Sequence, residues 1–377
     1  MVYKNARIFC SDGKFRNGAF EVTDGKFGRI LPSDIPKDAV DLENATVIPG
    51  LVDVHIHGAV GADLSDGSYE DLVRMAQHLA ACGVTAFVPA SMTLPYETLE
   101  KAFAAAKRLH DAPLPGCARL LGVHMEGPYF SEKKKGAQNG AYLKDPDIDG
   151  FMKLYEGCGG LVRIVDIAPE RPGSEAFIKA ASRKCTVGLA HTDCSYEDAR
   201  MAFGAGANHL THLFNAMPAI HHRNPGPIGA ASEQPTVRAE LICDGFHIHA
   251  AAVRLAFALF GAARMVLVSD GLRCLGLPDG KYELGGQDVF LEGGVAKLSD
   301  GTLAGSSTDL FECMRRAMSF GIAEADAVRA ATANPAAAAG VAEWAGSITT
   351  GKQADFIVCR SDYTGKRVFL AGKELQA

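Results

Sequence analysis

The stretch VIPGLVDVHIHG (residues 47–58) is an apolar run that ends in two histidines separated by one residue. Alternate side chains of a strand point to the same side, so His55 and His57 are predicted to share one face at the carboxyl end of a strand. Imidazole is the commonest protein ligand for zinc and similar metals. The motif alone fits ordinary surface or packing histidines equally well, so the rest of the chain must decide.

Downstream of this stretch, short apolar runs alternate with amphipathic segments typical of helices as far as residue 270. Eight such alternations fit an α/β fold with a closed parallel (β/α)8 barrel of the TIM type. A doubly wound open sheet is the alternative, but no GxGxxG motif follows the first strand. The expected strands are 51–55, 84–90, 119–126, 162–170, 186–191, 207–212, 237–245 and 265–271.

The two ends of the chain have a different pattern, with short strand-like runs around Gly and Asp-Gly turns. Such runs occur within residues 1–49 and again at 288–302, 354–362 and 366–375. We expect the two ends to combine into a small β-sandwich domain of residues 1–49 and 336–377. Residues 50–335 would form the barrel domain, and helical patterns from 307 to about 340 would complete its outer ring.

Composition limits the classes of partner and the compartment. The net charge of −6 argues against a nucleic-acid or anionic membrane surface, although local basic residues could still bind a phosphorylated small molecule. The ten cysteines are scattered without a CxxC pair, which indicates reduced thiols. The N-terminal run MVYKNARIF lacks the apolar core of a signal peptide, and Arg254 and Arg264 interrupt the apolar segment 250–268. We therefore expect a cytoplasmic protein.

Polar residues suited to catalysis lie at the predicted carboxyl ends of the strands, where a parallel barrel builds its active site. Each alone is explained as a helix cap, a surface residue or a hydrogen-bonded core histidine. Their common position on one rim is harder to explain in that way, and together they predict a metal site of histidines and carboxylates with one spare carboxylate. These residues are His55, His57, Glu126, His191, His212 and Asp270.

A resemblance to a known family becomes specific at this point. The motifs DVHIHG, HMEGPYF followed by KKGA, LAHTDCSY, THLFNAMP, RNPGPIGA, DGFHIH, VSDG and TLAGSS occur in the order found in N-acetylglucosamine-6-phosphate deacetylases. The chain resembles this branch of the amidohydrolase superfamily along nearly its whole length. The combination of HMEGP and THLFNAMP is highly specific, whereas HxH alone indicates only the superfamily.

The resemblance implies metal-dependent hydrolysis of the N-acetyl amide of N-acetyl-D-glucosamine 6-phosphate, which yields D-glucosamine 6-phosphate and acetate. It implies that Glu126, His191 and His212 bind the principal divalent metal. His55 and His57 match the extra pair of relatives that hold a second metal, with Glu126 bridging, so one or two ions per subunit are expected. Zinc is the first candidate, and iron, manganese and cobalt suit the same ligands. Asp270 matches the catalytic acid and base.

The resemblance also implies the substrate contacts and a homodimer in which Arg223 and His247 reach across the interface. One position departs from the family, which usually has histidine where this chain has Gln138; glutamine donates a neutral hydrogen bond but cannot become cationic. The sugar therefore stays open between N-acetylglucosamine 6-phosphate and a relative such as N-acetylgalactosamine 6-phosphate, and another amidohydrolase reaction is a further alternative. The intact ligand set disfavours a non-catalytic scaffold. The implied substrate contacts are Ala137, Gln138, Asn215, Ala216, Arg223, His247, Leu303, Ala304, Gly305 and Ser306.

Two further groups have simpler interpretations. Lys133, Lys134 and Lys135 form a basic run that is most simply a solvated surface. His124 is interpreted as a packing residue or one that supports the site from behind, rather than as a ligand.

Overall fold

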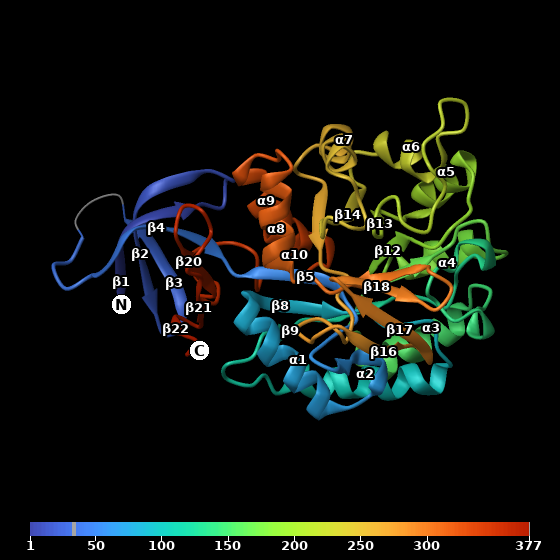
Figure 1. Cartoon of the computed structure of the whole chain (residues 1–377), viewed down its shortest axis with the longest axis horizontal. Helices are drawn as coiled ribbons and strands as arrows, with labels where there is room; N and C mark the ends of the chain where they lie inside the picture. The colour runs from blue at the N-terminus through green and yellow to red at the C-terminus, as the bar shows by residue number, and fades with distance from the viewer. Residues whose placement is uncertain (32–34, 377) are drawn as a thin grey trace.

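The computed structural model describes residues 1–31 and 35–376, and within these ranges the two ends of the chain share one sheet. It has seven strands in the order β22-β21-β20-β4-β1-β2-β3, and Figure 1 shows it at the left of the molecule. Aromatic rings fill its core: the rings of Phe356 and Phe369 stack with centroids 4.4 Å apart. The strands are β1 (Val2–Phe9), β2 (Phe15–Thr23), β3 (Lys26–Leu31), β4 (Val40–Pro49), β20 (Phe356–Cys359), β21 (Arg367–Leu370) and β22 (Lys373–Glu374).

Strands occur within all eight ranges expected for the parallel unit, and every pairing among them is parallel. The third range is split into two short strands, and between them the chain at Gly122 passes so close to Arg163 that a Cβ would overlap its side chain. Single bridges between Ala90 and His124 and between Ile56 and Gly271 connect the two resulting sheets. One sheet contains β5 (Leu51–Ile56), β8 (Val84–Pro89) and β9 (Arg119–Leu120); the other contains β10 (Val123–Met125), β11 (Val162–Ile167), β12 (Thr186–Leu189), β13 (His209–Leu210), β14 (Arg238–Ile242) and β15 (Met265–Val268).

Helices follow the strands and begin and end at residues that suit those positions. The Ser68 hydroxyl accepts a hydrogen bond from the backbone of Asp71 at the start of α1, and Gly83 ends that helix with φ of 93°. Ser195 and Asp198 form a capping box at α5. The helices are α1 (Tyr69–Cys82), α2 (Tyr96–Asp111), α3 (Ile148–Gly157), α4 (Ser174–Ala181), α5 (Tyr196–Ala205), α6 (Gly226–Ser232), α7 (Ala250–Phe260), α8 (Leu310–Ser319), α9 (Glu324–Ala331) and α10 (Ala333–Ala338).

A four-stranded antiparallel sheet lies between β15 and α8 in the chain. The run 288–302, whose strand pattern resembles that of the chain ends, belongs to this separate sheet and not to the sheet that the two ends share. Its Gly-Gly turn specifies a hairpin but not the neighbour of that hairpin, which a bridge between Gly271 and Ser306 provides. The strands are β16 (Gly280–Leu284), β17 (Gln287–Glu292), β18 (Val295–Leu298) and β19 (Leu303–Ser306).

The cysteines take no part in cross-links. All ten cysteines are free, as expected from their scatter along the chain. Across residues 1–31 and 35–376, no helix has the length and apolar character needed to cross a bilayer.

Several short elements occupy the loops. They are β6 (Gly58–Ala59), β7 (Ala62–Asp63), η1 (Leu64–Asp66), η2 (Glu132–Lys134) and η3 (Gly140–Tyr142).

Candidate active site

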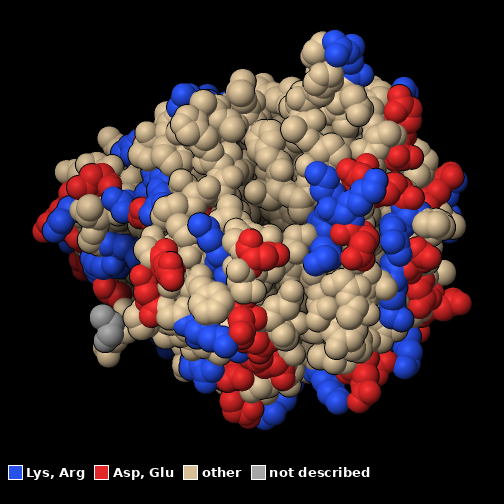
Figure 2. Space-filling model, turned by 45° about the vertical axis from the view of Figure 1, so that its right-hand side comes forward, with Lys and Arg blue, Asp and Glu red and all other residues tan. Residues whose placement is uncertain are grey.

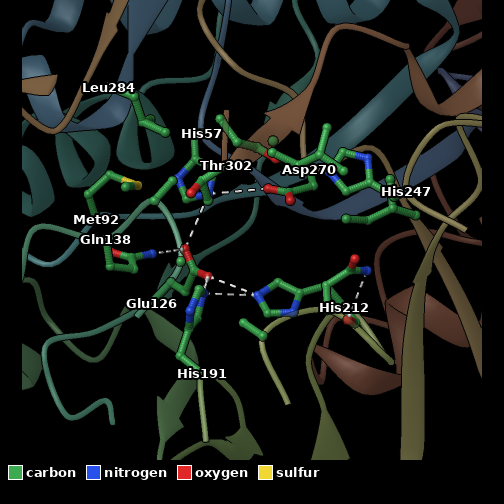
Figure 3. A pocket seen from close by; sticks show the side chains of 18 of the residues that line it. His57, Met92, Glu126, Gln138, His191, His212, His247, Asp270, Leu284 and Thr302 are labelled. Atoms are coloured by element: carbon green, nitrogen blue, oxygen red, sulfur yellow. Dashed lines mark hydrogen bonds and ion pairs between the residues drawn. The ribbon is translucent and has the colours of Figure 1, made fainter. Parts of the chain in front are cut away.

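The carboxylate of Glu126, directly after β10, lies between two pairs of histidines, and Figure 3 shows three of the four, His57, His191 and His212. Its Oε1 atom is 3.0 Å from His191 Nε2 and 3.2 Å from His212 Nε2. Its Oε2 atom is 3.2 Å from His57 Nε2 and 3.7 Å from His55 Nε2. All five side chains are buried, so residues far apart in the sequence converge at the ends of their strands.

The backbone turns sharply where three of these side chains enter the site. His191, His212 and Asp270 have φ of 43°, 31° and 49°, the left-handed region that non-glycine residues rarely adopt. Such conformations persist only where the surrounding structure enforces them, and they concentrate at functional sites. Here they end β12, β13 and β15 abruptly and direct the side chains toward Glu126.

The electrostatics of the cluster favour positive charge between the carboxylates. Burial alone raises the pKa of a carboxyl group, but hydrogen bonds from His191 and His212 and the nearby charge of His55 hold the pKa of Glu126 well below its usual range. Burial lowers the pKa of His57, yet hydrogen bonds to Asp270 and Glu126 outweigh it and raise that pKa to about 10. A divalent cation supplies the same positive charge, so protons and a metal ion would compete for this cluster.

The carboxylate of Glu240 orients His55 by contacting the ring nitrogen that does not face Glu126. Glu240 lies 2.9 Å from His55 Nδ1 and 2.8 Å from His209 Nε2, and it accepts a hydrogen bond from the backbone N–H of His212. Because His55 Nδ1 donates to Glu240, its Nε2 is the ring nitrogen that faces Glu126, and that atom is buried without a hydrogen-bond partner. An orphaned imidazole nitrogen facing a carboxylate is what a metal ligand requires, so the donor set fits a divalent ion.

Among the residues that the structure describes, three groups of side chains have donor atoms within 4.8 Å of one another, as metal binding requires. Two of them share Glu126: one with His55 and His57, the other with His191 and His212. The third combines His55 with Glu240 and His124, but His124 is engaged elsewhere, with Nδ1 2.9 Å from the Val54 carbonyl and Nε2 2.8 Å from the Asp166 carboxylate. His124 therefore supports the site from behind, as expected.

Asp270 completes the cluster on the side of β5. Its Oδ1 atom lies 3.3 Å from His57 Nε2 and 3.6 Å from His55 Nε2. Burial raises the pKa of Asp270, but the charges of His55 and His57 and the hydrogen bond to His57 lower it below the usual range. The side chain is thus ionised at neutral pH and able to accept a proton.

A cavity of about 350 Å³ opens above this cluster, with Glu126 and Asp270 in its wall. A match to the amidohydrolase family covers residues 46–375. The chain belongs to the amidohydrolase family. The expectation that it is a hydrolase of this superfamily is confirmed.

Close relatives in this family are amino-sugar phosphate deacetylases, as the sequence motifs indicate. The chain is 36% identical over 372 residues to the N-acetylglucosamine-6-phosphate deacetylase of Bacillus subtilis (strain 168), covering 96% of this chain and 93% of that protein. It is 31% identical to the N-acetylgalactosamine-6-phosphate deacetylase of Escherichia coli O157:H7, covering 99% and 98%. A similar solved structure is an aspartate-to-alanine variant of N-acetyl-D-glucosamine-6-phosphate deacetylase from Mycobacterium smegmatis in complex with N-acetyl-D-glucosamine-6-phosphate, with a TM-score of 0.94, 32% identity and coverage of 100% and 99%.

Most of the residues predicted to contact substrate line the amidohydrolase cavity. Ser306 is not among its lining; its backbone N–H instead donates to the Asp270 carbonyl at 2.7 Å and supports that residue. Arg223 is exposed in a loop and contacts His222, outside the cavity of its own chain. The predicted residues that do line the cavity are Ala137, Gln138, Asn215, Ala216, His247, Leu303, Ala304 and Gly305.

His247 lines the cavity of its own chain, which differs from the expectation that it reaches in from a neighbouring subunit. The ring is held locally: Nδ1 lies 2.7 Å from Asp244 Oδ2, and Nε2 lies 2.9 Å from the Ala304 carbonyl oxygen. Both partners are acceptors, so both ring nitrogens donate and the ring is cationic. Burial lowers the pKa of His247, but the hydrogen bond to Asp244 outweighs it and raises the pKa to about 9.

The sequence interpretation missed part of the cavity wall. Lys133 and Lys134 line the cavity, and Figure 2 shows basic side chains beside a hollow on this face of the molecule. The Lys133 side chain is nevertheless 80% exposed and pairs with Asp193 at 3.1 Å, as expected of a solvated run, whereas Lys134 is half-buried and is not plain surface. Their position a few residues after Glu126 is the signal that could have placed them. Met92, Ile242, Leu272 and Leu284 add an apolar wall that no motif indicated.

Proposed function

We propose that this amidohydrolase hydrolyses the N-acetyl amide of N-acetyl-D-glucosamine 6-phosphate to D-glucosamine 6-phosphate and acetate. The observation that carries the proposal is the Glu126 carboxylate between two histidine pairs, beside an ionised Asp270 in a cavity wall. The relatives at 36% and 32% identity, one of them named with this sugar phosphate bound, support the choice of substrate.

Amide hydrolysis requires an activated water, a polarised carbonyl and a protonated leaving nitrogen. Glu126, His191 and His212 would hold the principal divalent ion, and His55 and His57 a second. Such an ion, when bound, polarises the carbonyl and lowers the pKa of water toward about 7. Zinc is our first candidate, because imidazole and carboxylate ligands suit it.

Asp270 performs the proton transfers in this proposal. Its carboxylate accepts the proton of the attacking water and then delivers that proton to the amine nitrogen as the C–N bond breaks. Its buried position lets the carboxylate hold the proton close to the reacting atoms between the two transfers.

The cavity supplies cationic and neutral groups for the sugar phosphate. The imidazolium of His247 places positive charge in the wall, and the basic residue Lys134 lines the same cavity, while the Lys133 ammonium pairs with Asp193 at 3.1 Å. Asn215 and the backbone around Ala304 offer hydrogen-bonding groups for sugar hydroxyls. A phosphorylated substrate fits this charge pattern better than a neutral sugar does.

We further propose a homodimer in which Arg223 of the partner subunit completes the phosphate site. Arg223 is exposed and does not reach the cavity of its own chain. Large apolar side chains are exposed in three places: Ile220 in the same loop at 49%, Phe246 between β14 and α7 at 44%, and Leu255 on α7 at 66%. Burial of such residues is the usual driving force for association.

The architecture we propose is a closed (β/α)8 barrel formed by residues 50–335, with a small β-sandwich domain of residues 1–49 and 336–377. The bridges from Ala90 to His124 and from Ile56 to Gly271 support closure, because they connect the two parallel sheets at both junctions. The seven-stranded sheet built from both chain ends supports the division.

The experiment is an acetate-release assay with the zinc-loaded protein and the 6-phosphates of N-acetylglucosamine, N-acetylgalactosamine and N-acetylmannosamine. Unphosphorylated N-acetylglucosamine is the matched control for the phosphate site. The proposal predicts the highest kcat/KM for N-acetylglucosamine 6-phosphate. A preference for the galactosamine epimer would instead indicate an N-acetylgalactosamine-6-phosphate deacetylase. The Escherichia coli relative at 31% identity and the glutamine at position 138 are the reasons for including that substrate. No acetate from any of them would overturn the deacetylase assignment.

A further inference from the structure

Gln138 is almost fully buried, with 3% of its surface exposed, and its side-chain amide is held at both ends. The backbone N–H of Thr93 donates to Gln138 Oε1 at 2.7 Å. Gln138 Nε2 in turn donates to Glu126 Oε2 at 2.9 Å. A backbone N–H can only donate, so it fixes which end of the amide faces Glu126 and leaves the NH₂ group pointing at the carboxylate.

The loop that carries Gln138 is packed tightly between its neighbours. A Cβ on Gly127 would overlap the side chain of Thr93, so the chain directly after Glu126 passes very close to Thr93. A Cβ on Gly136 would lie 3.4 Å from the His191 ring. Gln138 therefore acts from a constrained position and not from a solvated loop.

The two oxygens of Glu126 depend on Gln138 to different degrees. Oε1 has two close histidine partners, His191 and His212, at 3.0 and 3.2 Å. Oε2 has His57 at 3.2 Å and the more distant His55 at 3.7 Å, so the Gln138 amide is its shortest contact. Removing the amide would take away the shortest contact of Oε2, whereas Oε1 would keep both of its histidine partners.

We propose that Gln138 is a positioning residue that holds Glu126 Oε2 toward His55 and His57 and thereby sets the affinity of this chain for a second divalent ion. The inference rests on the metal centre of the proposed function but not on its substrate. Hydrogen bonds to a ligating carboxylate typically change metal affinity by about 10- to 100-fold. The effect is selective, because the His191–His212 side keeps its contacts.

The test is a titration of the apoprotein with Zn²⁺ against a chromophoric chelator, without substrate. The variant Gln138→Met removes the donor at nearly constant volume. The matched control is Gln287→Met, which removes the 2.6 Å hydrogen bond from Gln287 Nε2 to the carbonyl of Ala137 on the same loop without contacting Glu126. We expect Gln138→Met to weaken the second equivalent about tenfold or more and the first by less than threefold, while Gln287→Met changes neither.

A second variant covers the case in which Gln138→Met does not fold. Gln138→Glu retains an acceptor for Thr93 but places a carboxylate against Glu126 Oε2, and it should weaken the second equivalent at least as much. Thermal melts of each apoprotein identify misfolded variants before titration.

Several results would overturn the inference. One is an equal loss of Zn²⁺ affinity at both equivalents in Gln138→Met, and another is that neither affinity changes. A third is a raised KM with normal metal binding, which would make Gln138 a substrate contact. A wild-type protein that binds one equivalent would also overturn it, yet would leave single-metal hydrolysis intact, and the acetate assay tests that separately.

Discussion

The replacement Asp270→Asn tests the proton-transfer role with little structural disturbance. The backbone contacts of Asp270, from its N–H to the His55 carbonyl at 2.9 Å and from the Ser306 N–H to its own carbonyl at 2.7 Å, do not involve the side chain. Asparagine also tolerates the left-handed conformation at φ of 49°. Glu126, His191 and His212 keep their mutual contacts, so metal content should be retained.

The expected loss of kcat in Asp270→Asn depends on whether another carboxylate in the cavity can act as the base. A positioned general base contributes about 100- to 10,000-fold. Glu126 is the other carboxylate among the described residues that line the cavity, and both its oxygens are engaged, so no described carboxylate can substitute. We therefore expect kcat to fall by about 1,000- to 10,000-fold, which corresponds to about 4–5 kcal/mol in the barrier, with KM changed by less than about threefold.

The control is Asp53→Asn, a second buried aspartate that lies two residues before His55 but outside the cavity lining. Its pKa is raised to about 7 by burial, so the amide resembles its protonated form. Steady-state kinetics with metal analysis on both variants decide the matter. Retention of more than a tenth of kcat by Asp270→Asn, or an equal loss in Asp53→Asn, would refute the assigned role.

Three further results are expected. His212→Ala should remove the principal metal, measured by elemental analysis after dialysis, whereas full occupancy would contradict the ligand assignment. Because the pKa of His247 is raised to about 9, its charge persists at neutral pH and is lost above about pH 9; KM for the phosphorylated substrate should rise there, and His247→Gln should abolish that rise. Arg223→Ala should raise KM about tenfold or more with a smaller change in kcat, and mixing it with Asp270→Asn subunits should restore part of the activity if Arg223 acts across a dimer.

The strand pattern and the side chains at the strand ends could be predicted because they depend on local rules. Alternation along β5 places His55 and His57 at one end of the strand, and apolar runs followed by helical patterns locate β12 and β13 ahead of His191 and His212. The sharp left-handed turns at these histidines could not be predicted. Histidine adopts positive φ more often than most non-glycine residues, but that tendency does not identify these two positions, where both rings point toward one carboxylate.

Features that depend on contacts between distant parts of the chain also could not be predicted from the sequence. The run 288–302 contains a clear hairpin, but the sheet that accepts it is chosen by contacts with the chain after β15. Lys134 resembles solvated surface in the sequence, but the fold of its loop places it in the cavity wall. The Gln138 amide could be read only as a possible substrate contact, because its two actual partners lie 45 and 12 residues away.

The strands that carry none of the predicted metal ligands also determine the site. β11 and β14 have no such residue at their ends, yet Asp166 within β11 holds His124, and Glu240 within β14 orients His55. The ring centroids of His55 and His124 are 4.6 Å apart, so these two carboxylates together fix neighbouring imidazoles below the cavity floor. A carboxylate buried in the middle of a strand would be costly without such partners. The pairing of each acid with a histidine therefore explains how two carboxylates can be buried within the parallel strands. It also orients the ligand nitrogens before any ion or substrate binds.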